Sequence, residues 1–293
     1  MCNIYLIQGK LKNVINSLQI IPNNSEIICL TYDYECFEFY GQNIIFIYKP
    51  KTTWAEGRNI LLEYVLSKKY QFEYLIFLDD DVFFANGSFS VFESLHKKYK
   101  PLIAIPLTNV ILESNRYNKK LIIQHPIGMD QIVQAYNKEV INENIILPYI
   151  TKFDNLSWWY SCEINTHLIL SKYRGKVLQF NNIIIFNKHH GFDQNFQTVD
   201  QNSLYKGGID YKYYPEIKEY IELKFGQQPK IQNLLFHDFK YPFKLYFKSI
   251  FEHLNFIYSN IKNPKYIYKF YFLKYPNNLV LKHTDHLNYN SFE

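Results

Sequence analysis

Cysteines and long apolar runs are scarce in this sequence. Only Cys2, Cys29, Cys36 and Cys162 occur, and no two of them have the CxxC spacing. We therefore expect free thiols in a reducing compartment. The N-terminal residues MCNIYLIQGK lack a basic segment followed by a long apolar run, and no stretch of about 18 apolar residues occurs. The sequence thus predicts neither a signal peptide nor a transmembrane helix, and it predicts a cytoplasmic location.

Apolar and aromatic residues are abundant, whereas charge is modest and unevenly placed. Hydrophobic residues make up 47% of the 293 residues and charged residues 20%, which is typical of a globular chain. With 27 Tyr and 24 Phe, large rings must carry much of the core packing. The net charge is +5, and residues 236–293 hold eight Lys against four Asp or Glu. Taken alone, this basic end suggests an anionic surface near the tail, either a membrane or a nucleic acid, and the alternative is a solvated basic face.

The most informative stretch reads EYLIFLDDDVFF. Its apolar run from Tyr74 to Leu78 is typical of a strand that is buried on both faces of a mainly parallel sheet. The run stops at Asp79, Asp80 and Asp81, and adjacent carboxylates repel one another and are costly to bury unpaired. Mg²⁺ or Mn²⁺ would stabilise them, because hard cations take oxygen ligands. At the carboxyl end of a strand, the cluster predicts a metal site for a phosphate-bearing substrate, and the alternative is a solvated acidic turn.

The residues before this strand predict a helix. Thr53 and Glu56 have the spacing of a capping box, and apolar residues then recur at helical spacing, at Ile60, Leu61, Tyr64 and Val65. The helix should begin near Trp54, where its N–H groups and dipole favour an anion such as a diphosphate. Arg58 could bind the same anion through its guanidinium. The alternative is that Arg58 pairs with Glu56 or Glu63 on the surface.

Strand and helix patterns alternate along the first hundred residues. Strands are predicted at residues 3–8, 26–32, 43–48, 74–78 and 101–106, and a second helix is predicted to follow a Ser90-x-x-Glu93 cap. This alternation predicts an α/β open sheet with right-handed crossovers. Further along, strands are predicted at residues 121–124, 145–147 and 178–186, with a helix that ends near Lys172. No internal repeat and no low-complexity linker occurs.

KTTWAEGRN is followed at short distance by YLIFLDDDVFF. A Gly/Ala-Arg-Asn helix start before an FLDxD strand occurs in many glycosyltransferases with the GT-A fold, and the sequence resembles them over residues 26–106. The resemblance implies a GT-A-like, Rossmann-like open mixed sheet flanked by helices. It also implies a catalytic domain at residues 1–228, with a donor half at about 26–106 and an acceptor half at 107–228. Residues 229–293 would form an aromatic and basic helical extension.

The resemblance also implies roles for single residues. Asp79 would face the ribose or the metal, and Asp81 would bind Mn²⁺ or Mg²⁺ that bridges the donor diphosphate. His190 would be a third metal ligand, or alternatively a structural histidine. The other residues expected to bind the donor are Thr31, Asp33, Arg58, Asn59 and Asp80. The base of the nucleotide stays open, because the first sheet strand ends without a recognised nucleoside-binding signature.

The chemistry of glycosyl transfer requires two functions. A leaving diphosphate must be stabilised, and a cation held by two carboxylates neutralises its developing charge. A base can also deprotonate the acceptor hydroxyl, and we expect Glu163 in this role with Asp154 as the second candidate. Trp158 and Trp159 precede Glu163, and their indole rings would suit stacking on an acceptor sugar. The alternatives are a helix-surface carboxylate for Glu163 and core packing for the tryptophans.

The segment from residue 240 to 258 has aromatic residues at helical spacing with lysines between them. Such a basic amphipathic helix could make a peripheral membrane contact, or it could pack on the main domain. The sequence thus predicts a metal-dependent transferase with a UDP- or GDP-sugar donor and a glycan or glycolipid acceptor, and no nucleic-acid partner. The alternatives are a nucleotidyltransferase or phosphohydrolase, or a non-catalytic sugar-binding relic of the fold. Against the phosphate enzymes, no Gly-rich phosphate loop precedes a Lys and no Asp-x-Asp-Gly-Thr run occurs.

Overall fold

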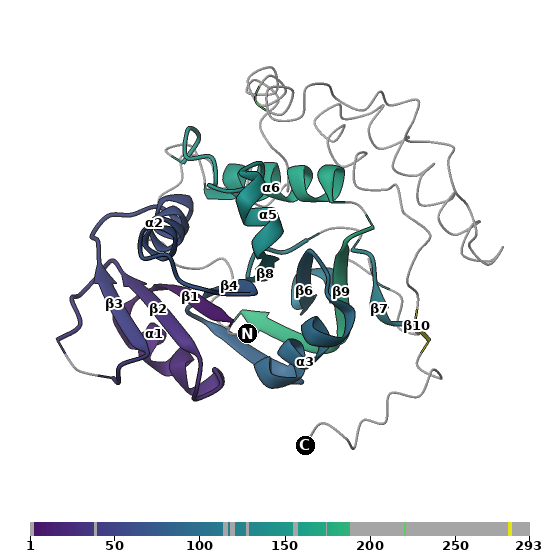
Figure 1. Cartoon of the computed structure of the whole chain (residues 1–293), viewed down its shortest axis with the longest axis horizontal. Helices are drawn as coiled ribbons and strands as arrows, with labels where there is room; N and C mark the ends of the chain where they lie inside the picture. Colours follow the sequence, from purple (N-terminus) through teal and green to yellow (C-terminus); the bar gives the residue numbers. More distant parts are fainter. Residues whose placement is uncertain are drawn as a thin grey trace.

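A computed structural model describes residues 3–37, 40–113, 117, 121–126, 129–154, 158–173, 175–187, 220 and 281–282. These residues form a mixed sheet with helices on both faces (Figure 1). The predicted α/β fold, an open mixed sheet flanked by helices, is therefore confirmed. The predicted C-terminal helical extension and its membrane contact lie almost wholly outside the described residues. No helix within the described part of the chain is long and apolar enough to cross a bilayer.

The sheet is parallel on one side and mixed on the other. Its strands are β1 (Ile4–Gly9), β2 (Glu26–Thr31), β3 (Ile44–Tyr48), β4 (Tyr74–Asp79), β5 (Val82–Asn86), β6 (Ile103–Thr108), β7 (Leu121–Gln124), β8 (Val133–Asn137), β9 (Val177–Asn187) and β10 (Leu281–Lys282). Their order is β10-β7-β9-β6-β8-β4-β1-β2-β3, and β5 pairs with β9 away from this path. Strand β1 pairs in parallel with both β2 and β4, whereas β8 is antiparallel to its neighbours β4 and β6.

Helices cover both faces of the sheet. They are α1 (Leu11–Ser17), α2 (Trp54–Ser67), α3 (Phe89–Tyr99), α4 (Asn109–Glu113), α5 (Lys138–Glu143) and α6 (Trp158–Lys172), with a short 3₁₀ turn at Leu18–Ile20 after α1. One apolar core joins the sheet to α2, α5 and α6, which lie along the upper side of the sheet in Figure 1. A second core joins the opposite face to α1 and α3. Each face of β4 therefore has its own core, which explains the unbroken apolar run of this strand.

The direction of the strand order reverses between β1 and β4. From β1 the chain passes through α1 to β2 on one side, whereas from β3 it passes through α2 to β4 on the other side of β1. Because α1 and α2 cover opposite faces, they diverge at the carboxyl ends of β1 and β4. Open α/β sheets bind their ligands at such a switch point. Gln8 and Asp79 pair there across the two strands.

Most of the predicted elements are present, and four differences stand out. Helix α2 begins at Trp54 with the predicted capping box of Thr53 and Glu56. The cap of α3 is Ser88 instead of Ser90, because Ser88 has extended backbone angles and accepts the Val91 N–H. Residues 145–147 form no strand. Strand β8 and helix α5 were not predicted, and in β8 the sequence VQAYN has no long apolar run.

Helix α3 buries a histidine whose ring has no polar partner among the described residues. His96 is 1% exposed, and neither ring nitrogen forms a hydrogen bond within the described residues. Its ring lies 4.1 Å from that of Phe92, 4.8 Å from Tyr74 and 5.9 Å from Phe180, measured between centroids. Burial lowers the pKa of His96 to about 3. The imidazole therefore stays neutral and packs as an aromatic ring.

The cysteines that the structure describes form no disulfide with one another. Cys29 and Cys162 are buried, and Cys36 is partly exposed. Cys2 lies outside the described residues.

Candidate functional site

The acidic end of β4 lies at the switch point of the sheet. Oδ1 of Asp79 accepts hydrogen bonds from Nη2 of Arg58 at 2.8 Å and from Nε1 of Trp54 at 3.2 Å. Oδ2 forms no hydrogen bond within the described residues, and the Asp79 side chain is 22% exposed. Thus one carboxylate oxygen is fixed by the protein and the other remains for a ligand.

Arg58 is the largest fully buried side chain of the described residues, at 1% exposure. Its Nη1 donates to Oε1 of Gln134 at 2.9 Å and to the Tyr149 hydroxyl at 3.3 Å, and Nη2 also donates to the Gln131 carbonyl at 2.7 Å. The Trp54 ring covers the guanidinium, with 4.1 Å between its centroid and Cζ. Burying an arginine is tolerable only with such partners. Direct contact between Arg58 and a nucleotide stays a prediction, and this burial does not favour it.

The charges of Arg58 and Asp79 depend on each other. Burial alone would lower the pKa of Arg58, but Tyr149 and Asp79 together raise it above its ordinary value. Burial raises the pKa of Asp79, while the charge and hydrogen bond of Arg58 and the bond from Trp54 oppose this shift. The guanidinium therefore stays charged and favours the carboxylate. A divalent cation at Asp79 would act in the same direction.

A buried polar network carries these contacts on to α6. Gln131 donates from Nε2 to Oγ1 of Thr166 at 2.7 Å, and the Tyr136 hydroxyl donates to Oδ1 of Asn165 at 3.3 Å. The hydroxyls of Tyr136 and Tyr149 are 3.1 Å apart. Because buried polar groups are costly unless they are paired, this network fixes one arrangement of α2, β8 and α6. It also links the acidic strand to the helix that carries Glu163.

Asp80 and Asp33 both face the N-terminus of α1. Oδ2 of Asp80 accepts the Lys10 N–H at 2.7 Å, and Oδ1 of Asp33 accepts the Leu11 N–H at 2.8 Å. The Asp80 side chain lies against Gly9, where a Cβ atom would come within 2.1 Å of the carboxyl group. Both carboxylates therefore satisfy backbone groups of the protein. Their contact with a donor remains untested.

The alternation of side chains along a strand separates Asp80 from Asp79. Successive residues point to opposite faces, so Asp79 lies toward α2 and Asp80 toward α1. Burial and then the charges of Asp81 and Asp79 raise the pKa of Asp80 to about 7, against the hydrogen bonds from Lys10 and Asn13. Asp80 is thus partly protonated near neutral pH, and its Oδ2 already accepts the Lys10 N–H.

Two further predicted donor residues bind the protein backbone. The Thr31 hydroxyl is fully buried and donates to the Tyr34 carbonyl at 2.7 Å. Asn59 donates to the Tyr149 carbonyl at 2.8 Å and accepts the Tyr149 N–H at 2.7 Å. Asn59 therefore fixes the loop before α6 onto α2. A donor contact from either side chain would compete with these bonds.

The candidate bases lie on or near α6. Oδ2 of Asp154 forms a short hydrogen bond with the Thr53 hydroxyl, and Oδ1 lies 2.7 Å from Oγ of Ser161. Burial raises the pKa of Asp154, while these two hydroxyls oppose the shift. Glu163 lies in the second turn of α6, so its role as the base stays a prediction.

Three predicted site residues remain, namely Trp158, Trp159 and His190. Trp158 and Trp159 begin α6, and their contact with an acceptor stays a prediction. His190 lies outside the described residues.

A metal ion would find two protein carboxylates at this edge of the sheet. Asp80 and Asp81 form the turn between β4 and β5, next to Asp79. The described residues contain no cluster of three or more His, Cys, Asp or Glu side chains that could hold a metal. Mg²⁺ is usually bound by only one or two carboxylates, with phosphates and water as the other ligands. Two carboxylates such as Asp79 and Asp81 would suffice as the protein's share of such a site, and their metal binding stays a prediction.

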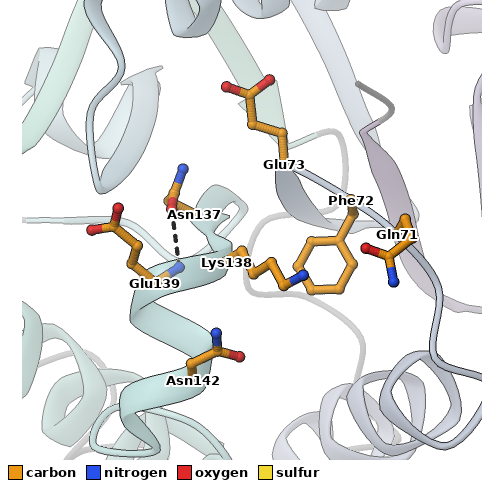
Figure 2. A pocket seen from close by; sticks show the side chains of 7 residues that line it. All are labelled: Gln71, Phe72, Glu73, Asn137, Lys138, Glu139 and Asn142. Atoms are coloured by element: carbon orange, nitrogen blue, oxygen red, sulfur yellow. Dashed lines mark hydrogen bonds between the residues drawn. The ribbon is translucent and has the colours of Figure 1, made fainter.

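An open pocket of about 770 Å³ lies at the opposite end of β4. Figure 2 shows the Lys138 chain beside the Phe72 ring, with Glu73 and Glu139 nearby. The site at Asp79 and this pocket are separated by the length of the strand, roughly 17 Å. The pocket therefore has no part in chemistry at the acidic end.

Two residues that hold the site in place were not predicted. Trp54 binds Asp79 and stacks on Arg58, and the spacing of four between Trp54 and Arg58 could have indicated one helix face. Gln8, the second-last residue of β1, pairs with Asp79 across the two strands and donates from Nε2 to the Trp54 carbonyl at 2.9 Å. A Cβ atom on Gly57 would lie 2.3 Å from Oε1 of Gln8, so the glycine admits this side chain.

No protein-family model and no curated protein matches the sequence. Among solved structures, the chain is similar to GalNAc-T7 with UDP, GalNAc and Mn²⁺, with a TM-score of 0.43 and 12% identity over 64% of this chain and 44% of that one. It is similar to S. aureus TarS 1-349 in complex with UDP-GlcNAc, with a TM-score of 0.43 and 9% identity over 76% and 66% of the two chains. For A197 from STIV the TM-score is 0.38 and the identity 14%, over 64% and 85%.

The chain thus spans less than half of the GalNAc-T7 chain and about two thirds of the TarS chain. At these TM-scores and identities, the likeness carries no information on substrate, metal or residue roles. The substrate, the metal and the residue roles depend on the residues at the switch point of the sheet.

Proposed function

We propose that this protein is a metal-dependent glycosyltransferase that takes a nucleotide-sugar donor at the carboxyl ends of β1 and β4. The observation that carries the proposal is the Asp79 carboxylate at the topological switch point. Its Oδ1 is held by Arg58 and Trp54, while Oδ2 remains for a ligand. The sequence order of Gly57-Arg58-Asn59 before the acidic strand supports the same reaction class.

In this proposal the chain's own residues position the donor. Asp79 and Asp81 would hold Mn²⁺ or Mg²⁺, which supplies charge neutralisation for the leaving diphosphate. Arg58 holds Asp79 from inside, so it acts through the carboxylate. Glu163 on α6 is the proposed base for the hydroxyl of a glycan or glycolipid acceptor, and Trp158 and Trp159 are proposed to stack on that acceptor.

The test compares Asp81→Ala with Glu73→Gln at the opposite end of β4. We expect Asp81→Ala to lose at least about 100-fold in donor hydrolysis and transfer, since a ligand of the diphosphate site is removed. The melting temperature should stay near that of the unchanged protein, and Glu73→Gln should keep its activity. Full activity of Asp81→Ala, or full activity in EDTA, would refute the metal role.

The first probes are UDP-GlcNAc, UDP-GalNAc and GDP-mannose, each with Mn²⁺, against ATP and CTP. Binding to the folded state raises stability by about 2.7 kcal/mol at a hundredfold excess over Kd, so a thermal shift detects it. Shifts with sugar nucleotides alone support the proposed function. Shifts with plain nucleotides alone would indicate a nucleotidyltransferase or phosphohydrolase, and binding without turnover would indicate a relic of the fold.

A further inference from the structure

Asp154 joins the start of α2 to α6 through two hydroxyl groups. Its Oδ2 lies against the Thr53 hydroxyl in a short hydrogen bond, and its Oδ1 lies 2.7 Å from Oγ of Ser161. Oγ of Ser161 is also 2.5 Å from the Ile150 carbonyl oxygen. All of these separations require a proton between the two oxygens.

The available protons can be counted. Thr53 has one hydroxyl proton, which it donates to Asp154, while its oxygen accepts the Glu56 N–H. Ser161 also has one proton, but two close oxygens need it. The Ile150 carbonyl can only accept. Each of these contacts has a proton if Asp154 carries one on Oδ1 and donates it to Ser161, which then donates its own proton to the Ile150 carbonyl.

The surroundings favour this neutral form. Ser161 is fully buried, and Glu56 is the charged group among the described residues that acts on the pKa of Asp154. Burial, followed by the weaker effect of Glu56, raises the pKa of Asp154, while the hydrogen bond from the Thr53 hydroxyl opposes this shift. No described cation opposes these effects.

We propose that Asp154 is a protonated carboxylic acid in the folded protein and that it positions the start of α2 against α6. It therefore does not serve as the base that deprotonates an acceptor. Thr53 caps α2 directly before Trp54, which binds Asp79, and Ser161 lies two residues before Glu163. The positioning role rests on the proposed glycosyltransferase function, whereas the protonation state does not.

Asp154→Asn is the decisive variant. An amide mimics the neutral acid, because its oxygen can accept from Thr53 and its NH₂ can donate to Ser161. In the unchanged protein the folded pKa of Asp154 lies above the unfolded value, so stability from this group is lost as pH rises from the unfolded pKa to the folded one. We therefore expect Asp154→Asn to gain stability on the unchanged protein as pH rises above the unfolded pKa, with a slope of up to about tenfold in the unfolding constant per pH unit.

Urea unfolding at several pH values measures this difference, and contributions from all other groups cancel between the two proteins. Asp154→Ala should be less stable than Asp154→Asn at every pH. If Asp154→Ala does not fold, Ser161→Ala replaces it and should also lose stability. The proposal would be overturned if the difference in free energy of unfolding between Asp154→Asn and the unchanged protein stayed constant with pH. It would also be overturned if Asp154→Asn became less stable relative to the unchanged protein as pH rises.

Activity provides the second readout. With a donor that turns over, Asp154→Asn should retain most of kcat, whereas Asp154→Ala should lose it. A base in this position would give the opposite result, since the amide cannot take a proton. If the unchanged protein turns over no donor, the proposed function fails, while the pH dependence of stability still decides the protonation state.

Discussion

Replacing His96 by phenylalanine should make the protein less sensitive to acid. His96 is enclosed by aromatic rings, and neither of its nitrogens has a partner within the described residues. Protonation in the fold would place an unpaired charge in this core, so the folded pKa is about 3 against 6.5 for an exposed imidazole. Below pH 6.5 the unfolded chain therefore binds a proton that the folded protein does not.

The magnitude follows from these two pKa values. A group whose folded pKa is depressed makes the protein less stable as pH falls below the pKa of that group in the unfolded chain. For His96 the loss is about 1.4 kcal/mol near pH 5.5 and about 2.7 kcal/mol near pH 4.5. Since the folded value of about 3 lies below this range, the unfolded pKa sets the loss. Against a typical total of about 5–15 kcal/mol, the effect is easily measured.

The assay is urea unfolding of both proteins at pH 7.0, 5.5 and 4.5. Relative to the unchanged protein, the free energy of unfolding of His96→Phe should rise as pH falls, by about 1.4 kcal/mol near pH 5.5 and about 2.7 kcal/mol near pH 4.5. Lys97→Gln on the exposed side of the same helix is the matched control, because it removes a charge without burial and should follow the unchanged protein. Parallel losses in His96→Phe and the unchanged protein would mean that His96 takes up a proton in the fold, and the reasoning would fail.

Two further predictions concern close contacts around the acidic strand. Arg58→Lys should lower the free energy of unfolding by about 2–4 kcal/mol in urea titrations, because a single ammonium cannot replace the four hydrogen bonds of the guanidinium. An unchanged urea midpoint would show that these bonds are dispensable. Gly9→Ala should cost about 1–3 kcal/mol, since the new methyl group meets the Asp80 carboxyl group at 2.1 Å. Gly57→Ala should change stability by less than about 1 kcal/mol, since the flexible end of Gln8 can move and alanine favours the helix. Equal losses in the two glycine variants would contradict this distinction.

Local patterns were sufficient to predict the parallel half of the sheet. The apolar run of β4 and the capping box at Thr53 depend only on neighbouring residues, and both are present as predicted. Strand β8 was missed because Gln134 and Tyr136 face a buried polar network, which erases the apolar pattern of the strand. A polar residue in a core is recognisable only with its partners.

The environment of Arg58 shows the same limit for the site. The arginine was expected near an anion, but its contacts with Gln131, Gln134 and Tyr149 come from residues more than 70 positions away. No local pattern reports such distant partners. The position of Asp79 at the carboxyl end of its strand, by contrast, followed from the run that precedes it.

The two strands that flank β4 limit how far this protein can be shortened and whether its motifs can be moved into another protein. One neighbour is β1 (Ile4–Gly9) and the other is β8 (Val133–Asn137), so both come from outside residues 26–106, where the motifs lie. A fragment with the motifs alone would leave both edges of the acidic strand bare, and Arg58 would lack most of its acceptors. The stretch with the motifs therefore cannot be transplanted alone. Its acidic residues gain a fixed orientation only when β1 and β8, which are far apart in the sequence, pair with β4.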